Sequence, residues 1–159
     1  MSLNSVNIAT PLGIAKICGD EIGITSISIL NDDKSPSDEI PENLKLAVTE
    51  LRQYFDGKRQ EFTFPINPSG TDFQKTVWRE LQNIPFGKTL SYLELAKRLG
   101  DVNAIRAAAS ANGKNPLWIV VPCHRVIGSD GSLTGYAGGL WRKKWLLEHE
   151  TPPTQQSLF

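Results

Sequence analysis

Residues 5–30 alternate apolar and polar side chains with a period of two, the pattern of short strands that bury one face. The alternating segments are residues 6–10, 14–17 and 22–29. Between them, Pro11-Leu12-Gly13 and Gly19-Asp20-Glu21 have the composition of hairpin connections. The chain is therefore expected to begin with three short strands joined by tight turns.

From residue 41 to residue 56 the apolar period changes to that of a helix. Pro41 stands near its first turn and Gly57 follows its last, which are favoured positions for these residues at helix ends. Residues 62–65 suit either one more strand or an extended connection, and residues 67–70, Asn-Pro-Ser-Gly, suit a linker. The sequence thus predicts a small mixed α/β domain over residues 1–68.

Residues 71–117 are expected to be helical. A first helix stops before Pro85, a second starts at the capping box of Ser91 and Glu94, and a third covers residues 104–111. The last two lie across a tight turn, which predicts a helix-turn-helix.

The second helix of that pair has little side-chain bulk beyond Ile105 and Arg106. Small residues let a helix backbone approach another surface closely, but they also suit a helix packed tightly in a core. Both interpretations stay open at this point. A final helix from about Gly139 is interpreted as a packing helix with a basic outer face, formed by Arg142, Lys143 and Lys144.

Cys123 stands in an unusual setting, Pro122-Cys123-His124-Arg125. The apolar run 117–121 is expected to be a strand ending at Pro122, because proline fixes its own φ and favours extended geometry in the residue before it. The thiolate is the reactive form of cysteine, and nearby cations stabilise it. A buried structural cysteine is the alternative, but a proline, a cation and an imidazole beside one thiol favour a nucleophile.

At 159 residues the chain can hold one domain or two small ones. It has no apolar run that could cross a bilayer and no signal-peptide pattern, so an intracellular location is expected. Its two cysteines, Cys18 and Cys123, lack metal-ligand spacing. Neither a disulfide framework nor a zinc site is expected, and Cys18 is interpreted as a packed strand residue.

The formal net charge is zero, but the charges are distributed unevenly. Residues 1–85 carry 8 Lys and Arg against 12 Asp and Glu, whereas residues 86–145 carry 9 against 3. A cationic segment around the thiol favours a polyanionic substrate, with an ordinary solvated face as the alternative.

Several motifs in the second half of the chain occur together. They are Ile84-Pro85-Phe86-Gly87, Ser91-Tyr92, Arg106-Ala107, Asn115-Pro116, Pro122-Cys123-His124-Arg125-Val126, Gly135-Tyr136-Ala137-Gly138-Gly139-Leu140 and Trp145-Leu146-Leu147-Glu148-His149-Glu150. In this order they closely resemble the O6-alkylguanine-DNA alkyltransferases, or methylated-DNA–protein-cysteine methyltransferases. The resemblance covers residues 72–150, and the earlier residues agree only in general character.

The resemblance implies an α/β (α+β) fold. A small N-terminal α/β domain, residues 1–68, would precede a mainly helical catalytic and DNA-binding domain with a helix-turn-helix, residues 69–151. A flexible tail, residues 152–159, would follow. The implied activity is DNA repair by direct damage reversal. An alkyl group, chiefly methyl, would move irreversibly from O6 of guanine in duplex DNA to Cys123, once per molecule, with no cofactor or metal.

The resemblance also implies roles for individual residues. His124 would be the base, acting through a water molecule, with Glu150 orienting it and Tyr92 donating toward the leaving guanine. The backbone carbonyls of Cys123 and Val126 would accept from the guanine amine. Further implied residues are the DNA contacts Arg106 (which would replace the flipped nucleotide), Ala107, Ala109, Ala111 and Arg125, the pocket residues Trp118, Val126, Tyr136, Ala137 and Gly138, and the hinge Asn115.

Proteins of other classes remain as alternatives. A non-catalytic sensor would bind alkylated DNA and flag it for another repair pathway, although Cys123 argues against this. A cysteine hydrolase would turn over repeatedly, and a helix-turn-helix regulator would give a sequence-specific footprint.

The chain ends in a segment from Gln155 to Phe159 that looks like the pentapeptide that docks into bacterial sliding clamps. A disordered tail with two apolar residues is the alternative. A cytoplasmic monomer acting on double-stranded DNA, with no membrane association, is expected.

Overall fold

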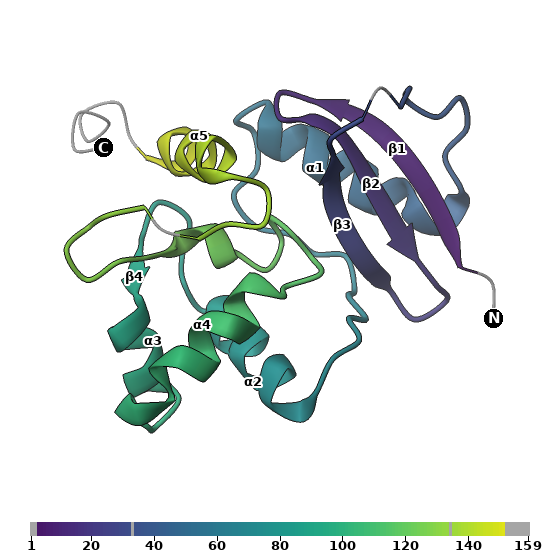
Figure 1. Ribbon diagram of the computed structural model, residues 1–159. Coiled ribbons are helices and arrows are strands. Elements are labelled where there is room, and N and C mark those ends of the chain that lie inside the picture. Colours follow the sequence, from purple (N-terminus) through teal and green to yellow (C-terminus); the bar gives the residue numbers. More distant parts are fainter. Residues whose placement is uncertain (1–2, 33, 134, 152–159) are drawn as a thin grey trace. The chain divides into compact units, whose positions relative to one another are not determined.

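The computed structural model describes residues 3–32, 34–133 and 135–151. The chain divides into two compact units, Met1–Ser69 and Gly70–Phe159 (Figure 1). The tail from Gln155 to Phe159 lies outside the described residues, so the sliding-clamp prediction is not addressed by the structure.

The first unit is an antiparallel sheet with a helix on one face (Figure 1). Its strands are β1 (Asn4–Thr10), β2 (Gly13–Gly19) and β3 (Ile24–Leu30), in the order β1-β2-β3. A short 3₁₀ helix, η1 (Glu42–Leu44), leads into α1 (Lys45–Phe55). Alternating strand residues such as Ile8, Ala15 and Ile17 are buried. The three predicted strands, both hairpins and the helix are therefore confirmed.

Residues 62–65 form an extended connection rather than a fourth strand. Within the described part of the first unit, this segment meets the sheet through a single parallel bridge between Ile24 and Ile66. The backbone amide of Ile24 donates to the Pro65 carbonyl at 2.9 Å, and the Asn67 amide donates to the Ile24 carbonyl at 2.7 Å.

The second unit begins with the helices α2 (Asp72–Leu81), α3 (Tyr92–Arg98) and α4 (Ile105–Gly113), with the 3₁₀ turn η2 (Val102–Ala104) before α4. Capping boxes start α2 at Thr71 and α3 at Ser91. The indole nitrogen of Trp78 on α2 donates to the Ala111 carbonyl on α4 at 2.9 Å. The predicted helix pair α3–α4 is thus present and packs against α2.

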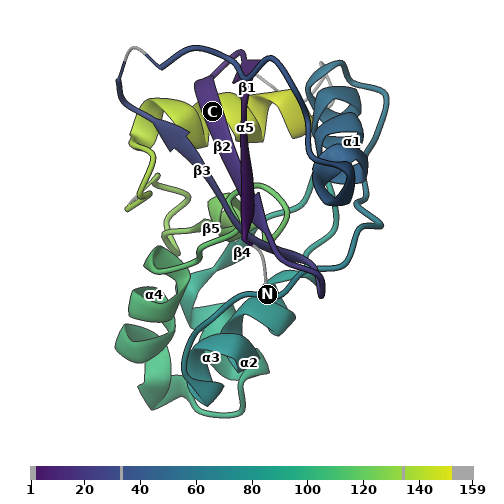
Figure 2. The same ribbon diagram turned by 90° about the vertical axis from the view of Figure 1, so that its right-hand side faces the viewer.

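A two-stranded parallel sheet joins distant parts of this unit. Its strands are β4 (Leu90–Ser91) and β5 (Val126–Ile127). Both views show α5 (Leu140–Glu150) on one side of this pair and α2, α3 and α4 on the other (Figures 1 and 2). Because β4 runs directly into α3, and β5 directly follows η3 (Cys123–Arg125), the sheet links the start of α3 to the Cys123 segment.

Two sequence predictions for this unit are wrong. Residues 117–121 form a turn rather than a strand, since Val120 and Val121 donate to the carbonyls of Trp118 and Leu117. The basic outer face of α5 is also not formed, because Arg142 and Lys143 are buried while Leu140 and Trp141 are exposed. The predicted fold class, a mixed α/β fold, is nonetheless confirmed.

Candidate active site

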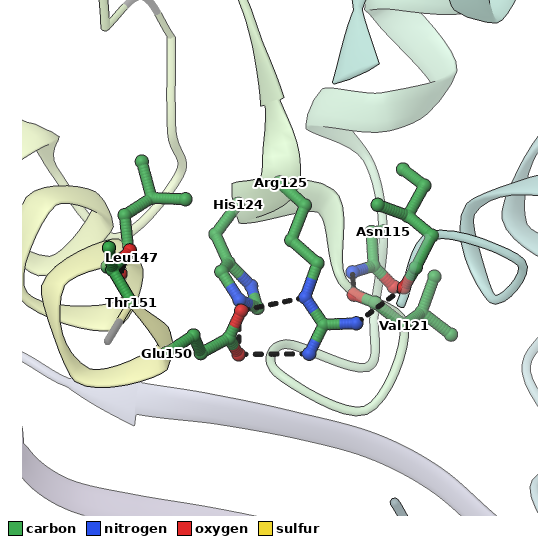
Figure 3. Close-up of polar contacts among 8 residues, drawn as sticks. Asn115, Val121, His124, Arg125, Leu147, Glu150 and Thr151 are labelled. Atoms are coloured by element: carbon green, nitrogen blue, oxygen red, sulfur yellow. Dashed lines mark hydrogen bonds and ion pairs between the residues drawn. The ribbon is translucent and has the colours of Figure 1, made fainter. Parts of the chain in front are cut away.

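A polar side chain shapes the turn that precedes Cys123. The Asn115 amide nitrogen donates to the Val121 carbonyl at 2.7 Å (Figure 3). It also donates to the Leu117 carbonyl at 3.2 Å. Its oxygen accepts from the Leu117 backbone amide at 2.9 Å. Ile119 adopts a positive φ of 76°, which is unfavourable for a β-branched residue and needs surrounding contacts to hold it. These bonds turn an apolar run that alone favours a strand.

Cys123 is the first residue of η3 and is 5% exposed. Burial raises the pKa of its thiol to about 11, while a hydrogen bond from Asn115 and the charge of Lys143 act in the opposite direction. The thiol is therefore neutral near pH 7 in this state of the protein. Proton removal at that pH needs a base inside the site.

His124 and Arg125 flank Glu150, which ends α5 (Figure 3). The Nε2 atom of His124 lies 2.9 Å from Glu150 Oε2. Arg125 donates through Nε to Glu150 Oε1 at 2.7 Å and through Nη2 to Oε2 at 2.9 Å. All three side chains are buried. Burial alone would raise the pKa of Glu150, but its electrostatic and hydrogen-bond contacts with His124 and Arg125 lower it below its usual range.

The contact with Glu150 fixes the tautomer of His124. Nε2 faces a carboxylate and therefore carries a proton, which leaves Nδ1 as the acceptor of the neutral ring. That Nδ1 atom is buried and has no hydrogen-bond partner among the described residues. The imidazole beside Cys123 is thus arranged to accept a proton.

Arg125 does not fit its expected place among DNA contacts. Its side chain is buried, and its remaining Nη1 group donates to the Ile84 carbonyl at 2.6 Å. With Nε and Nη2 directed at Glu150, the guanidinium holds the active-site carboxylate rather than facing solvent. We attribute a structural role to Arg125 and remove it from the DNA-contact set.

Lys143 on α5 is fully buried. Its ammonium group donates to the Val126 carbonyl at 2.6 Å and lies 5.9 Å from the centre of the Tyr92 ring. Burial lowers the pKa of Lys143 to about 8, and the charge of Cys123 acts in the opposite direction. The Val126 carbonyl, expected to accept from a guanine amine, already accepts from this lysine.

The predicted pocket residues are partly brought together. The rings of Trp118 and Tyr136 lie with centroids 5.7 Å apart. A Cβ atom on Gly138 would lie 2.8 Å from Tyr136 and 3.0 Å from Trp118, so these three positions are in contact. Val126 is buried and Ala137 is exposed. Tyr92, the first residue of α3, is half-buried and faces Lys143.

The small residues of α4 divide between its two faces. Arg106 and Ala107 are exposed and Ala109 is half-buried. Ala111 is buried, and its backbone carbonyl accepts from the Trp78 indole on α2, so its expected contact with DNA stays a prediction. Packing in the core therefore accounts for one face of this helix, and close approach of its exposed face to DNA stays a prediction.

Two residues that sequence reasoning missed also belong to this region. Lys143 lies in a basic triplet that predicts a solvent-exposed surface. Asn112 precedes a glycine, a pairing that indicates a helix end, yet its side chain is buried and donates to the Cys123 carbonyl at 3.4 Å. Neither signal distinguishes these residues from ordinary surface or capping residues. Across residues 3–32, 34–133 and 135–151, no cluster suited to a metal ion is found.

No helix in the described ranges is long and apolar enough to span a membrane. The second unit carries a helix-turn-helix and places a buried thiol beside an imidazole that a carboxylate holds in one tautomer. These features define a protein with a candidate cysteine nucleophile. Comparison with known proteins narrows this class to one family.

Two family descriptions match nearly the whole chain. Residues 7–68 match the 6-O-methylguanine DNA methyltransferase ribonuclease-like domain, and residues 72–152 match the DNA-binding domain of the same family. The chain belongs to the 6-O-methylguanine DNA methyltransferase family. The family predicted from the sequence is therefore confirmed.

Individual relatives agree with this assignment. A methylated-DNA–protein-cysteine methyltransferase of Methanosarcina barkeri is 46% identical over 149 residues, covering 90% of this chain and 94% of its own. The crystal structure of the Mycobacterium tuberculosis O6-methylguanine methyltransferase matches with a TM-score of 0.84 and 41% identity, covering 99% of both chains. The M. tuberculosis protein OGT in complex with DNA matches with a TM-score of 0.83 and 40% identity, covering 96% and 98%.

Proposed function

We propose that this protein repairs DNA by direct damage reversal. It moves an alkyl group, chiefly methyl, from O6 of guanine in duplex DNA to the sulfur of Cys123, once per molecule. The observation that carries the proposal is the buried His124–Glu150 contact beside the Cys123 thiol. The names of the relatives agree with it.

The chemical step is a displacement at the alkyl carbon. The sulfur forms a bond to carbon while the bond from carbon to guanine O6 breaks. The thiol proton passes through a water molecule to Nδ1 of His124, whose ring is held by Glu150. Because burial raises the thiol pKa to about 11, this internal base replaces loss of the proton to solvent.

The leaving guanine takes up negative charge unless it is protonated. Tyr92 lies where α3 begins, near the buried Lys143 ammonium, and donates a proton or hydrogen bond to the leaving base. The Tyr92 hydroxyl is therefore assigned to stabilising the leaving group, and His124 to activating the nucleophile. A thioether forms on Cys123, and the protein is consumed.

DNA binding uses the exposed face of α4. A base inside a duplex cannot reach a buried thiol, so the nucleotide must be flipped out of the stack. Arg106 is exposed on this helix and fills the vacated place, while Ala107 and Ala109 allow close approach to the groove. Trp118, Tyr136 and Gly138 line the pocket for the flipped base, and Asn115 fixes the turn before the nucleophile.

The protein is further proposed to act as a cytoplasmic monomer. The segment from Gln155 to Phe159, outside the described residues, is proposed to dock on a bacterial sliding clamp. Deleting these five residues should abolish retention on immobilised clamp and leave the transfer rate unchanged; unchanged retention would remove the clamp proposal.

The decisive experiment is intact-mass analysis and peptide mapping after mixing the protein with a duplex containing one O6-methylguanine. We expect a gain of one methyl group on the peptide that carries Cys123, saturating at one per molecule. Tight binding without a mass change, with Cys123 oxidation excluded, would instead support a non-catalytic sensor.

The role of Arg106 has its own test. Arg106→Ala should slow repair of methylated duplex DNA by about tenfold or more, because the flipped nucleotide loses its replacement in the stack. Reaction with free O6-benzylguanine base should keep its rate, since no flipping is needed. Equal losses on both substrates would remove the proposed role.

A further inference from the structure

Two buried hydrogen-bond acceptors without partners belong to residues that adjoin Cys123. One is Nδ1 of His124, the next residue in the chain. The other is Oδ1 of Asn112, whose side chain is 3% exposed and reaches Cys123 from the last turn of α4. In the described part of the chain these are the only buried side-chain polar atoms without a partner. Buried polar groups are nearly always satisfied, so their position beside the proposed nucleophile needs an explanation.

Asn112 is tied to the backbone of the nucleophile itself. Its Nδ2 group donates to the Cys123 carbonyl at 3.4 Å, a long bond between α4 and the first residue of η3. Because Nδ2 is directed at a carbonyl, the amide orientation leaves Oδ1 as the free acceptor. Asn115 has no such spare atom, since both ends of its amide hold the turn 117–121.

Both acceptors need a hydrogen-bond donor. A thiol has one weak hydrogen and can satisfy only one acceptor. A water molecule carries two hydrogens and can also accept from the thiol. A single water therefore matches the thiol, the imidazole and the Asn112 amide together.

We propose that Asn112 is a positioning residue for the transfer reaction: it holds the Cys123 carbonyl through Nδ2 and orients, through Oδ1, the water that carries the thiol proton to His124. This inference rests on the proton relay of the proposed function. The thiol proton moves to the water oxygen as one water proton moves to Nδ1 of His124, so the water is regenerated and Cys123 is left as a thiolate. Asn112 itself exchanges no proton.

Its place on α4 adds a consequence. The same helix carries Arg106 at its exposed start, so the DNA-facing helix and the carbonyl of the nucleophile are joined through one side chain. A shift of α4 when DNA docks would therefore move the Cys123 carbonyl and change the surroundings of the thiol.

The test uses Asn112→Leu, which is close to asparagine in size and removes both polar atoms. The readout is the rate at which iodoacetamide alkylates Cys123 across the pH range, with no DNA present. Titratable groups near the thiol, namely His124, Glu150, Lys143, Tyr92 and Tyr136, are unchanged. Ser110→Ala, an exposed position on the same helix, is the matched control.

We expect Asn112→Leu to slow alkylation at pH 7 by about tenfold, the loss of one hydrogen bond of ordinary strength. Asn112→Ser, whose hydroxyl can still accept from a water molecule, should recover part of the rate. The thermal midpoint of Asn112→Leu should fall slightly, because the Cys123 carbonyl loses the Nδ2 donor. Ser110→Ala should match the wild type in both measurements.

An unchanged pH–rate profile in Asn112→Leu would overturn the proposal. A rate in Asn112→Ser as slow as in Asn112→Leu would overturn it too, because a hydroxyl that binds water would then make no difference and the residue would be purely structural. Failure of the proposed function is seen separately, since it appears as absent methyl transfer from duplex DNA to the wild-type protein.

Discussion

At the scale of single residues, Glu150 is the most constrained group of the site. One carboxylate serves a buried imidazole and a buried guanidinium together. Such a group both orients the proposed base and compensates the charge of Arg125. Removing the Glu150 carboxylate therefore affects both stability and reactivity. Arg125 relies on it for charge compensation, and His124 relies on it for orientation.

Glu150→Gln should lower the free energy of unfolding by about 3–5 kcal/mol, because the Arg125 charge stays buried without a counter-charge. Thermal or urea unfolding measures this loss. A variant as stable as the wild type would show that Arg125 finds another partner, contrary to the geometry. The methyl-transfer rate of the fraction that remains folded should also fall, because His124 loses its orienting partner.

The low pKa of Glu150 also predicts an acid limit to stability. In the unfolded chain this carboxyl titrates near 4.5, and its pKa is lower in the fold. Its contribution is thus complete above about pH 4.5 and is lost as the pH falls through the folded value. Chemical unfolding followed from pH 7 downward should show a fall in stability below about 4.5 that is smaller in Glu150→Gln.

Lys143 offers a comparison with its neighbour. Its charge stabilises the Cys123 thiolate, whereas Lys144 is exposed and pairs with Glu148 at 3.8 Å. Lys143→Met should move the iodoacetamide pH–rate profile of Cys123 to higher pH, because the thiolate loses a nearby cation. Lys144→Met should leave the profile in place. Equal profiles in the two variants would contradict an electrostatic role for Lys143.

At the scale of elements, local signals in the sequence predict local structure well. The capping box at Ser91 forms as its residue pattern indicates, and so do the hairpins. The β4–β5 pair is invisible to such reasoning, since each strand has two residues and its partner is distant. Residues 117–121 were misread because their apolar pattern is that of a strand, while the Asn115 side chain and the positive φ of Ile119 make a turn.

The same contrast holds for the candidate site. Cys123 could be predicted from its motif, and His124 and Glu150 from the family resemblance. Arg125, Lys143 and Asn112 could not be placed, because the sequence shows charge and polarity but not which side of an element is buried. Their positions depend on tertiary packing of η3 and β5 against α4 and α5.

The aromatic pair of Trp118 and Tyr136 leads to a prediction about substrate size. Trp118 belongs to the turn before the nucleophile, and Tyr136 to the segment before α5. We expect the indole to narrow the pocket, so Trp118→Ala should raise the ratio of benzyl to methyl transfer rates by several-fold or more. Trp141→Ala, at an exposed tryptophan of α5, is the matched control. An unchanged ratio in Trp118→Ala would assign the size limit to other residues.

At the scale of the whole molecule, burial changes the meaning of the charge pattern. Nine Lys and Arg lie within residues 86–145, but Arg125, Arg142 and Lys143 among them are buried. The remaining six are exposed: Lys88, Lys97, Arg98, Arg106, Lys114 and Lys144. The three acidic residues of the segment, Glu94, Asp101 and Asp130, are all exposed. The surface is thus less cationic than the sequence indicates, and the buried cations serve the site instead.

This surface predicts a moderate salt dependence for repair of duplex DNA. Each phosphate contact contributes about −0.9 to the slope of log affinity against log salt, so six exposed cations limit the slope to roughly −5. The rate constant for repair of methylated duplex, measured at low protein concentration, should fall as the salt concentration rises from about 50 to about 200 mM. The reaction with free O6-benzylguanine should hardly change, because that base is neutral and releases no counterions. Equal salt sensitivity would mean that salt acts on the buried Glu150 network rather than on DNA contacts, and a slope well beyond −5 would require cations outside this segment.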